Sequence, residues 1–252
     1  MSVVTSRDGT HIAYERAGSG PPLVLIDAAG HFRANSALGE LADLLTGDFT
    51  VYRYDRRGRG ESGDTPSYAP AREVEDIAAL VAAAGAPVAL YGYSSGCLVA
   101  LHAAAAGLDV RRLVLLEPPI GSAEGSATQR AFTAKLRELS GEDAVTYFLT
   151  EIGVPDELLA GMRGTPHWQA MVSVAHTLAY DSELSEATTS ALLSRVTAPA
   201  LVLASSGSGG ELTGMAASAA AALPHAVHRS LAGEWHSVPA TALAPVVTDF
   251  LR

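Results

Sequence analysis

Residues 89–103 read ALYGYSSGCLVALHA, and this stretch decides the fold. It begins with a short apolar run typical of a buried strand and ends in a run of helix-forming residues. The segment GYSSG lies between the two. Where a strand turns sharply into a helix around a serine, the residues two before and two after that serine must be small. Gly92 and Gly96 meet this requirement for Ser94, whereas Ser95 would have larger neighbours. The segment therefore predicts a nucleophilic Ser94 on a sharp turn; the alternative is a turn without chemistry.

Strand-like and helix-like segments alternate on both sides of this stretch. The Asp8-Gly9 dipeptide predicts a hairpin between the first two strands. The later strand-like runs are 21–27, 50–55, 86–92, 111–117, 198–205 and 225–233, and most are nearly continuous in apolar residues, as strands covered on both faces should be. Helices are expected over 36–45, 71–85, 97–107 and 214–223 and after Pro239. This order predicts an α/β fold with a mostly parallel eight-stranded sheet and helices on both faces.

The alternation is interrupted between residues 122 and 197. That region carries helix-like pieces at 127–139, 142–152, 155–163 and 166–179, which predict an inserted helical cap. The core then comprises residues 1–121 and 198–252. The Ser/Gly stretch SSGSGG at 205–210 has the composition of a short flexible linker.

Composition narrows the class of protein. A chain of 252 residues that is 48% hydrophobic and 17% charged fits one globular domain with an insertion. A net charge of −10 offers no basic field for nucleic acid, so that partner is not expected. Without an apolar leader or an 18-residue apolar run, we expect a cytoplasmic protein with no membrane partner. Cys97 is the only cysteine, which excludes an intramolecular disulfide and a metal site of several thiolates.

A nucleophilic serine needs a base, and the base needs an orienting group. His236 is the expected base because it lies in LAGEWHSVP, between the last predicted strand and the last helix. His102 is expected to be packed in the helix after GYSSG, and His31, His167 and His176 do not follow the last strand.

The chain resembles the α/β-hydrolase superfamily through VLID, YDRRGRGESG, GYSSG, LVLAS and the late histidine loop, in that order. The resemblance covers essentially the full chain and implies a catalytic triad with no cofactor. Gly58, Gly60 and Gly63 match G-x-G-x-x-G, but DTPSYAP follows instead of a helix, so dinucleotide binding is rejected. The arginines of this loop, which alternate with acids, are interpreted as a structural ion-pair loop.

Two acids compete for the third place in the triad. The loop after the seventh strand, where most of the superfamily carries its acid, reads ASSGSGGEL and offers only Glu211, beside a predicted helix start. Glu117 directly follows the sixth strand, and Pro118 keeps it out of helical geometry at the carboxyl edge of the sheet. The zearalenone-type lactonases are similar in having a Ser-Ser-Gly elbow and a Glu after the sixth strand. Glu117 is therefore preferred as the acid. The alternatives are that Glu211 is the acid, or that Glu117 only caps the first turn of the helical region that follows.

The resemblance implies that the backbone N–H groups of Ala29 and Ser95 form an oxyanion hole. At the start of the Ala29 loop the chain has Asp27-Ala28 where the family commonly has His-Gly. Asp27 is expected either to bind a substrate hydroxyl or to hold the loop. Trp168 and Met171, three residues apart on a predicted cap helix, are the preferred substrate-binding pair, although packing within the cap explains them equally well.

These features predict a serine hydrolase that cleaves a carboxylic ester or lactone of a hydrophobic small molecule through an acyl-enzyme. Two alternatives stay open: C–C cleavage, lyase or acyl-transfer chemistry with the same residues, and a non-catalytic small-molecule receptor on the same scaffold. The substrate and the oligomeric state stay open as well.

Overall fold

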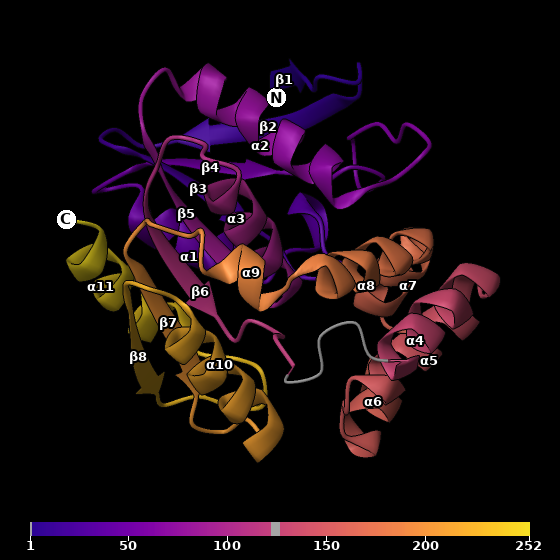
Figure 1. Ribbon diagram of the computed structural model, residues 1–252. Helices are drawn as coiled ribbons and strands as arrows, with labels where there is room; N and C mark the ends of the chain where they lie inside the picture. Colours follow the sequence, from indigo (N-terminus) through magenta and orange to yellow (C-terminus); the bar gives the residue numbers. More distant parts are fainter. Residues whose placement is uncertain (1, 122–126) are drawn as a thin grey trace.

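The computed structural model describes residues 2–121 and 127–252, and an eight-stranded sheet organises the molecule (Figure 1). The strands are β1 (Ser2–Thr5), β2 (His11–Ala17), β3 (Pro22–Ile26), β4 (Thr50–Tyr54), β5 (Val88–Tyr93), β6 (Val110–Leu116), β7 (Ala200–Ser205) and β8 (Ala226–Leu231). They lie in the order β1-β2-β4-β3-β5-β6-β7-β8. This confirms the predicted fold class.

Only the amino-terminal edge of the sheet is antiparallel. β2 pairs antiparallel with both β1 and β4, and the other neighbouring pairs are parallel. The hairpin between β1 and β2 turns at Asp8-Gly9, where Gly9 has a φ of 89° and the Thr10 amide donates to Asp8 Oδ1 at 3.0 Å. A positive φ at this point is the reason the turn uses glycine. The carboxyl ends of β3 and of β5 to β8 consequently meet at one edge.

Helices cover both faces of the sheet (Figure 1). The core helices are α1 (Gly39–Leu45), α2 (Pro70–Ala84), α3 (Ser95–Ala105), α10 (Gly210–Ala222) and α11 (Ala240–Leu251). Along β3, Leu23 and Leu25 pack towards α1 and α11, whereas Val24 and Ile26 pack towards α2 and α3. Both faces of β3 are therefore buried, which explains why its sequence is continuously apolar.

The helices between β6 and β7, called the cap below, lie mostly beside the carboxyl edge of the sheet (Figure 1). They are α4 (Ala127–Glu138), α5 (Gly141–Glu151), α6 (Asp156–Met162), α7 (Pro166–Ser173), α8 (Leu178–Ala187) and α9 (Ser190–Leu193). The first residues of the predicted cap, 122–126, lie outside the described residues. The single helix predicted over 166–179 was wrong. The chain turns at 175–177, where the Thr177 hydroxyl donates to the Val174 carbonyl at 2.7 Å, and continues as α8 in a new direction.

Within the two described ranges, no helix is both long and apolar enough to cross a membrane.

Candidate active site

Ser94 lies at the junction of β5 and α3. Its φ of 51° and ψ of −123° bend the chain sharply between the two elements. A side chain at Gly92 would place its Cβ 2.6 Å from the backbone of Cys97, and one at Gly96 would collide with the carbonyl oxygen of Ile26. Both glycines are therefore required by close backbone approach, as a nucleophile elbow demands.

Glu117 follows β6 directly and faces His236. Its Oε2 lies 2.5 Å from His236 Nδ1, and its Oε1 accepts a hydrogen bond from the Ser205 amide at 2.8 Å. Burial raises the pKa of the Glu117 carboxyl, but hydrogen bonds from His236, Ser208 and the Ser205 amide outweigh burial and leave that pKa below its ordinary value. Glu117 is thus a carboxylate at neutral pH and fixes a proton on Nδ1 of the histidine.

The His236 loop, between β8 and α11, is held by its backbone as well as by Glu117. The His236 amide donates to Ser208 Oγ at 2.9 Å, and its carbonyl accepts from the Tyr93 hydroxyl at 2.7 Å. With Nδ1 bound to Glu117, the free nitrogen of the neutral ring is Nε2, which is the nitrogen that a general base needs. His236 and Ser94 line the same cavity.

Backbone strain marks the same three residues independently of their chemistry. Among the described residues, the non-glycine residues with positive φ are Ser94 at 51°, Glu117 at 50° and His236 at 52°. Such conformations cost of order 1–3 kcal/mol each and persist where the surrounding structure imposes them, commonly at functional sites. Because each residue follows the end of a different strand, the strain is imposed separately at three places that converge on one site.

The SSGSGG stretch is not a flexible linker, so that prediction was wrong. Ser205 Oγ donates to the carbonyl of Glu234 at 2.6 Å, and Ser208 accepts from the His236 amide. A Cβ at Gly207 would lie 2.7 Å from Cα of Glu234, so the glycine permits the loop to pack against the histidine loop. The small residues permit close packing against the loop of His236.

Glu211, the alternative acid, lies in the first turn of α10 and lines the cavity. The carboxylate that contacts His236 is that of Glu117.

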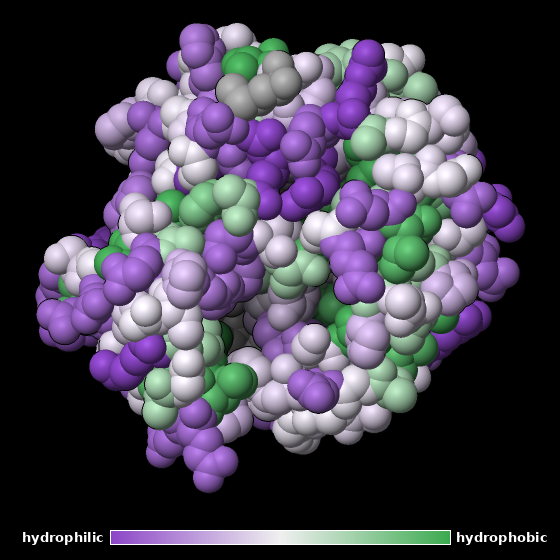
Figure 2. Space-filling view, turned by 180° about the vertical axis from the view of Figure 1, so that it is seen from behind, coloured by the Kyte–Doolittle hydropathy of each residue, from purple (hydrophilic) through white to green (hydrophobic). Residues whose placement is uncertain are grey.

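A cavity of about 710 Å³ lies between the sheet edge and the cap. Figure 2 shows the surface hollowed between these two parts of the molecule. Ser94 and His236 lie in its wall, together with Ala29 and Ser95, the two residues whose amides are expected to form the oxyanion hole. The rest of the wall is largely apolar, with Leu98, Phe132, Phe148, Leu149, Ile152, Val154, Leu158, Met162, Met171, Leu212, Met215 and Trp235.

Asp27 directly precedes Ala28 and Ala29 in the chain, but unlike them it does not line the cavity. It is 5% exposed, and its Oδ1 has no hydrogen-bond partner within the described part of the chain. Burial raises the pKa of the Asp27 carboxyl, against the opposing influence of the His31 imidazole and the Ser36 hydroxyl. Two roles were expected for Asp27. Its buried position is inconsistent with direct contact with a substrate, and it is consistent with support of the loop.

Of the expected pair Trp168 and Met171, only Met171 lies in the cavity wall. Met171 lines the cavity, but Trp168 is 1% exposed and packs within the cap. The Trp168 indole N–H donates to Glu142 at 3.4 Å, and the Arg163 guanidinium lies 5.4 Å from its ring centroid. Packing between α7 and α5 therefore explains Trp168, and its expected place in the cavity wall was wrong.

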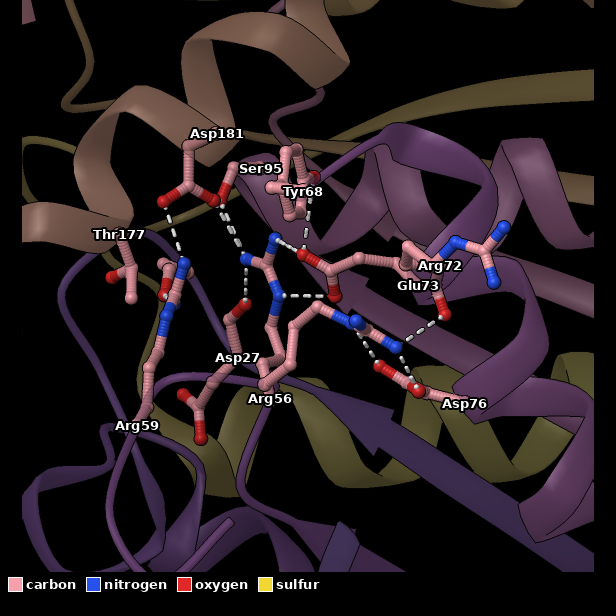
Figure 3. A network of polar contacts seen from close by, with 12 residues as sticks. Asp27, Arg56, Arg59, Tyr68, Arg72, Glu73, Asp76, Ser95, Thr177 and Asp181 are labelled. Carbon is pink, nitrogen blue, oxygen red and sulfur yellow. Dashed lines mark hydrogen bonds and ion pairs between the residues drawn. The ribbon is translucent and has the colours of Figure 1, made fainter. Parts of the chain in front are cut away.

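The arginine loop after β4 is a buried ion-pair network that joins the cap to the core (Figure 3). Arg56 Nη1 and Arg59 Nη2 bind the two oxygens of Asp181 in α8, at 2.7 and 2.6 Å. Arg56 Nη2 also binds Glu73 at 2.6 Å. The Ser95 hydroxyl donates to Asp181 Oδ1 at 2.7 Å, so the residue after the nucleophile is held by the cap. The ion-pair interpretation of the loop is confirmed, although these acids lie outside it.

Sequence reasoning missed Asp181, Tyr93 and Ser208. Asp181 belongs to a polar helical segment with no motif, and only its contacts across the cap-core boundary reveal its role. Tyr93 lies inside the GYSSG motif, and a buried tyrosine hydroxyl usually has a hydrogen-bond partner.

Within the described ranges, no three His, Cys, Asp or Glu side chains converge as a metal site would require.

A family model described as "Alpha/beta hydrolase family" matches residues 17–248. The chain belongs to the alpha/beta hydrolase family. A solved alpha/beta hydrolase from Sphaerobacter thermophilus is 41% identical over the whole of both chains, with a TM-score of 0.88.

Two curated relatives match over less of the chain. Pyrrolizixenacetamide deacetylase of Xenorhabdus hominickii is 36% identical over 42% of this chain. Pimeloyl-[acyl-carrier protein] methyl ester esterase of Xylella fastidiosa is 35% identical over 40% of it. The chain spans 40% and 38% of the lengths of these two relatives.

Proposed function

We propose that this alpha/beta hydrolase cleaves a carboxylic ester or lactone of a hydrophobic small molecule, with Ser94 as the nucleophile. The observation that carries the proposal is the 2.5 Å contact between Glu117 Oε2 and His236 Nδ1, because His236 lines the same cavity as Ser94. The order Ser94, Glu117, His236 along the chain is the order of triads in this fold. The likeness to zearalenone-type lactonases, with the acid after the sixth strand, belongs to this proposal.

The first half of the reaction forms an acyl-enzyme. His236 Nε2 removes the proton of Ser94 as Oγ attacks the carbonyl carbon, and Glu117 stabilises the imidazolium that results. The oxyanion accepts hydrogen bonds from the N–H groups of Ala29 and Ser95. The carbon-oxygen bond to the leaving alcohol then breaks, and His236 gives its proton to the leaving oxygen. In a lactone the alcohol stays attached to the acyl chain.

Water completes the cycle. His236 removes a proton from water, the hydroxide attacks the acyl carbon, and Ser94 leaves with the proton returned by His236. The products are a carboxylic acid and an alcohol.

The character of the cavity supports the substrate class. Its apolar wall suits a hydrophobic small molecule, and about 710 Å³ lies within the range of ligand pockets. One curated relative is a methyl ester esterase, and ester cleavage here would be in keeping with it.

Hydrolysis of p-nitrophenyl butyrate in ¹⁸O-labelled water tests the proposal. We expect one labelled oxygen in the butyrate product, and we expect Ser94→Ala to abolish turnover above the uncatalysed rate. A Ser95→Ala protein should keep the reaction, because the oxyanion donor at that position is the backbone N–H. Turnover that persists in folded Ser94→Ala, or an unlabelled product, would contradict a serine hydrolase.

A further inference from the structure

Two histidines outside the triad lie together in the cavity wall. His31 belongs to the loop after β3, and His167 belongs to the first turn of α7 in the cap. Both line the cavity of Ser94, and their ring centroids are 5.1 Å apart with the planes at 52°. The two imidazoles therefore meet across the boundary between core and cap.

The hydrogen-bond partner of His31 determines which of its nitrogens is free. His31 Nδ1 lies 2.9 Å from the carbonyl oxygen of Ala29. A carbonyl oxygen only accepts, so the proton of the neutral ring must be on Nδ1. Nε2, on the opposite edge of the ring, is then a lone-pair acceptor.

His167 is held in the same way. Its Nδ1 lies 2.9 Å from Oδ1 of Asn35, which also accepts only. Burial lowers the pKa of the His167 imidazole below its ordinary value, so His167 is neutral at pH 7. Its Nε2 is a second acceptor, on a ring whose centroid lies 5.1 Å from that of His31.

The surroundings of this pair indicate what it accepts from. In the described part of the cavity wall, the charged side chains are Glu151, Asp181 and Glu211, with no lysine or arginine. An anionic ligand would meet acids and bare ring nitrogens, which is unfavourable. A neutral ligand with a hydroxyl would supply the missing proton donor while the rest of the molecule contacts the apolar wall.

We propose that His31 and His167 form a hydrogen-bond acceptor subsite that selects substrates bearing a hydroxyl group on an otherwise apolar body. The inference rests on the proposed hydrolase function and narrows its substrate class to hydroxylated esters or lactones.

The subsite is close enough to the triad for one small substrate to reach both. The His31 ring lies edge-on to Tyr93, with centroids 6.4 Å apart, and the Tyr93 ring lies 5.1 Å from that of His236. A hydroxyl separated from the ester by an aromatic ring and a short chain suits this spacing.

Three matched esters test the subsite: methyl 3-(4-hydroxyphenyl)propanoate, its 4-methoxy analogue, and the unsubstituted phenyl ester. We expect kcat/KM of the wild-type protein to be at least roughly tenfold higher for the hydroxy ester than for either analogue, as one well-placed hydrogen bond provides. The unsubstituted ester separates loss of the donor from the added size of the methoxy group.

Variants of the two histidines should change this ratio. His31→Phe and His167→Phe should each bring the hydroxy preference to within roughly twofold. His167→Gln keeps an amide oxygen that can accept and should restore part of the preference, which a purely structural role would not produce. His228→Gln, at an exposed histidine of β8, is the matched control and should leave the ratio unchanged.

Binding to folded Ser94→Ala protein, measured by calorimetry with the same three esters, separates this inference from the proposed function. Tighter binding of the hydroxy ester without wild-type turnover of any of the three would retain the subsite and reject the hydrolase. Turnover without a hydroxy preference in either assay would reject the subsite and retain the hydrolase. A preference for the methoxy ester would show that the imidazoles donate, and would also overturn the inference.

Discussion

Replacing Glu117 by glutamine should remove catalysis while leaving the cavity intact. The glutamine amide keeps the shape of the side chain, and its oxygen can still accept from the Ser205 amide, now 2.8 Å from Glu117 Oε1. Its NH₂ group then faces His236 Nδ1, which lies 2.5 Å from Oε2 in the native protein. An N–H donor in this place forces the histidine proton onto Nε2. The ring then presents a proton to Ser94 instead of a base.

The magnitude follows from two losses. The charge-assisted hydrogen bond that stabilises the imidazolium contributes about 1.5 to 3 kcal/mol, and restoring the productive tautomer breaks the new amide hydrogen bond at a cost of about 1 to 3 kcal/mol. Together they raise the barrier by about 2.5 to 6 kcal/mol, which lowers kcat by roughly 10² to 10⁴. KM should change by no more than about threefold, because Glu117 does not contact the cavity.

The assay is steady-state hydrolysis of p-nitrophenyl butyrate by the wild-type protein, Glu117→Gln and Glu211→Gln. Glu211→Gln is the matched control, since it makes the same chemical change at the competing acid, and its kcat should stay within a few-fold of wild type. Thermal denaturation of the variants checks that both are folded. A folded Glu117→Gln protein within tenfold of wild type, or a larger loss in Glu211→Gln, would refute the assignment of the acid.

Three further predictions concern the supports of the site. Asp181→Asn leaves two buried arginines short of a counter-charge and should lower the free energy of unfolding by about 3 to 5 kcal/mol in urea denaturation; a loss below about 1 kcal/mol would contradict the network. Burial lowers the pKa of His102 from 6.5 to about 4. Between pH 6.5 and pH 4, His102 therefore binds a proton in the unfolded chain but not in the folded chain. The wild-type protein should therefore lose about 3 kcal/mol more stability than His102→Gln as the pH falls from 7 to 4, and equal slopes for the two proteins would be inconsistent with this. Gly207→Ala should lower kcat at least roughly tenfold, because the new Cβ displaces the loop that carries His236; an unchanged kcat would show that the loop adjusts freely.

Local sequence patterns were sufficient to predict the sheet and the places of Ser94 and Glu117 along the chain. β3 and the last four residues of β6, 113–116, are buried, and their continuous apolar sequences reflect this directly. The serine turn was recognisable because steric limits at Gly92 and Gly96 act within a few residues of Ser94. Glu117 could be preferred because Pro118 restricts its backbone and because a strand end fixes its place at the sheet edge.

The features that were mispredicted depend on contacts between distant segments. The spacing of Trp168 and Met171 shows that they share a face of α7, but the packing of α5 decides which of them the cap encloses. A Ser/Gly-rich composition is equally suited to a linker and to a tightly packed loop, and only the approach of the His236 loop distinguishes the two. Asp181 has no local signal because its partners lie 86 to 125 residues away in the sequence.

Labelling with a fluorophosphonate probe, followed by peptide mass spectrometry, tests the central claim most directly. A probe of this kind forms a stable bond only with a serine that an adjacent base activates. We predict stoichiometric modification of Ser94 in the wild-type protein, and strongly slowed modification in folded Glu117→Gln. Folded wild-type protein that stays unlabelled, or that carries the label on Ser95, would contradict the assignment of Ser94, His236 and Glu117 as a catalytic triad.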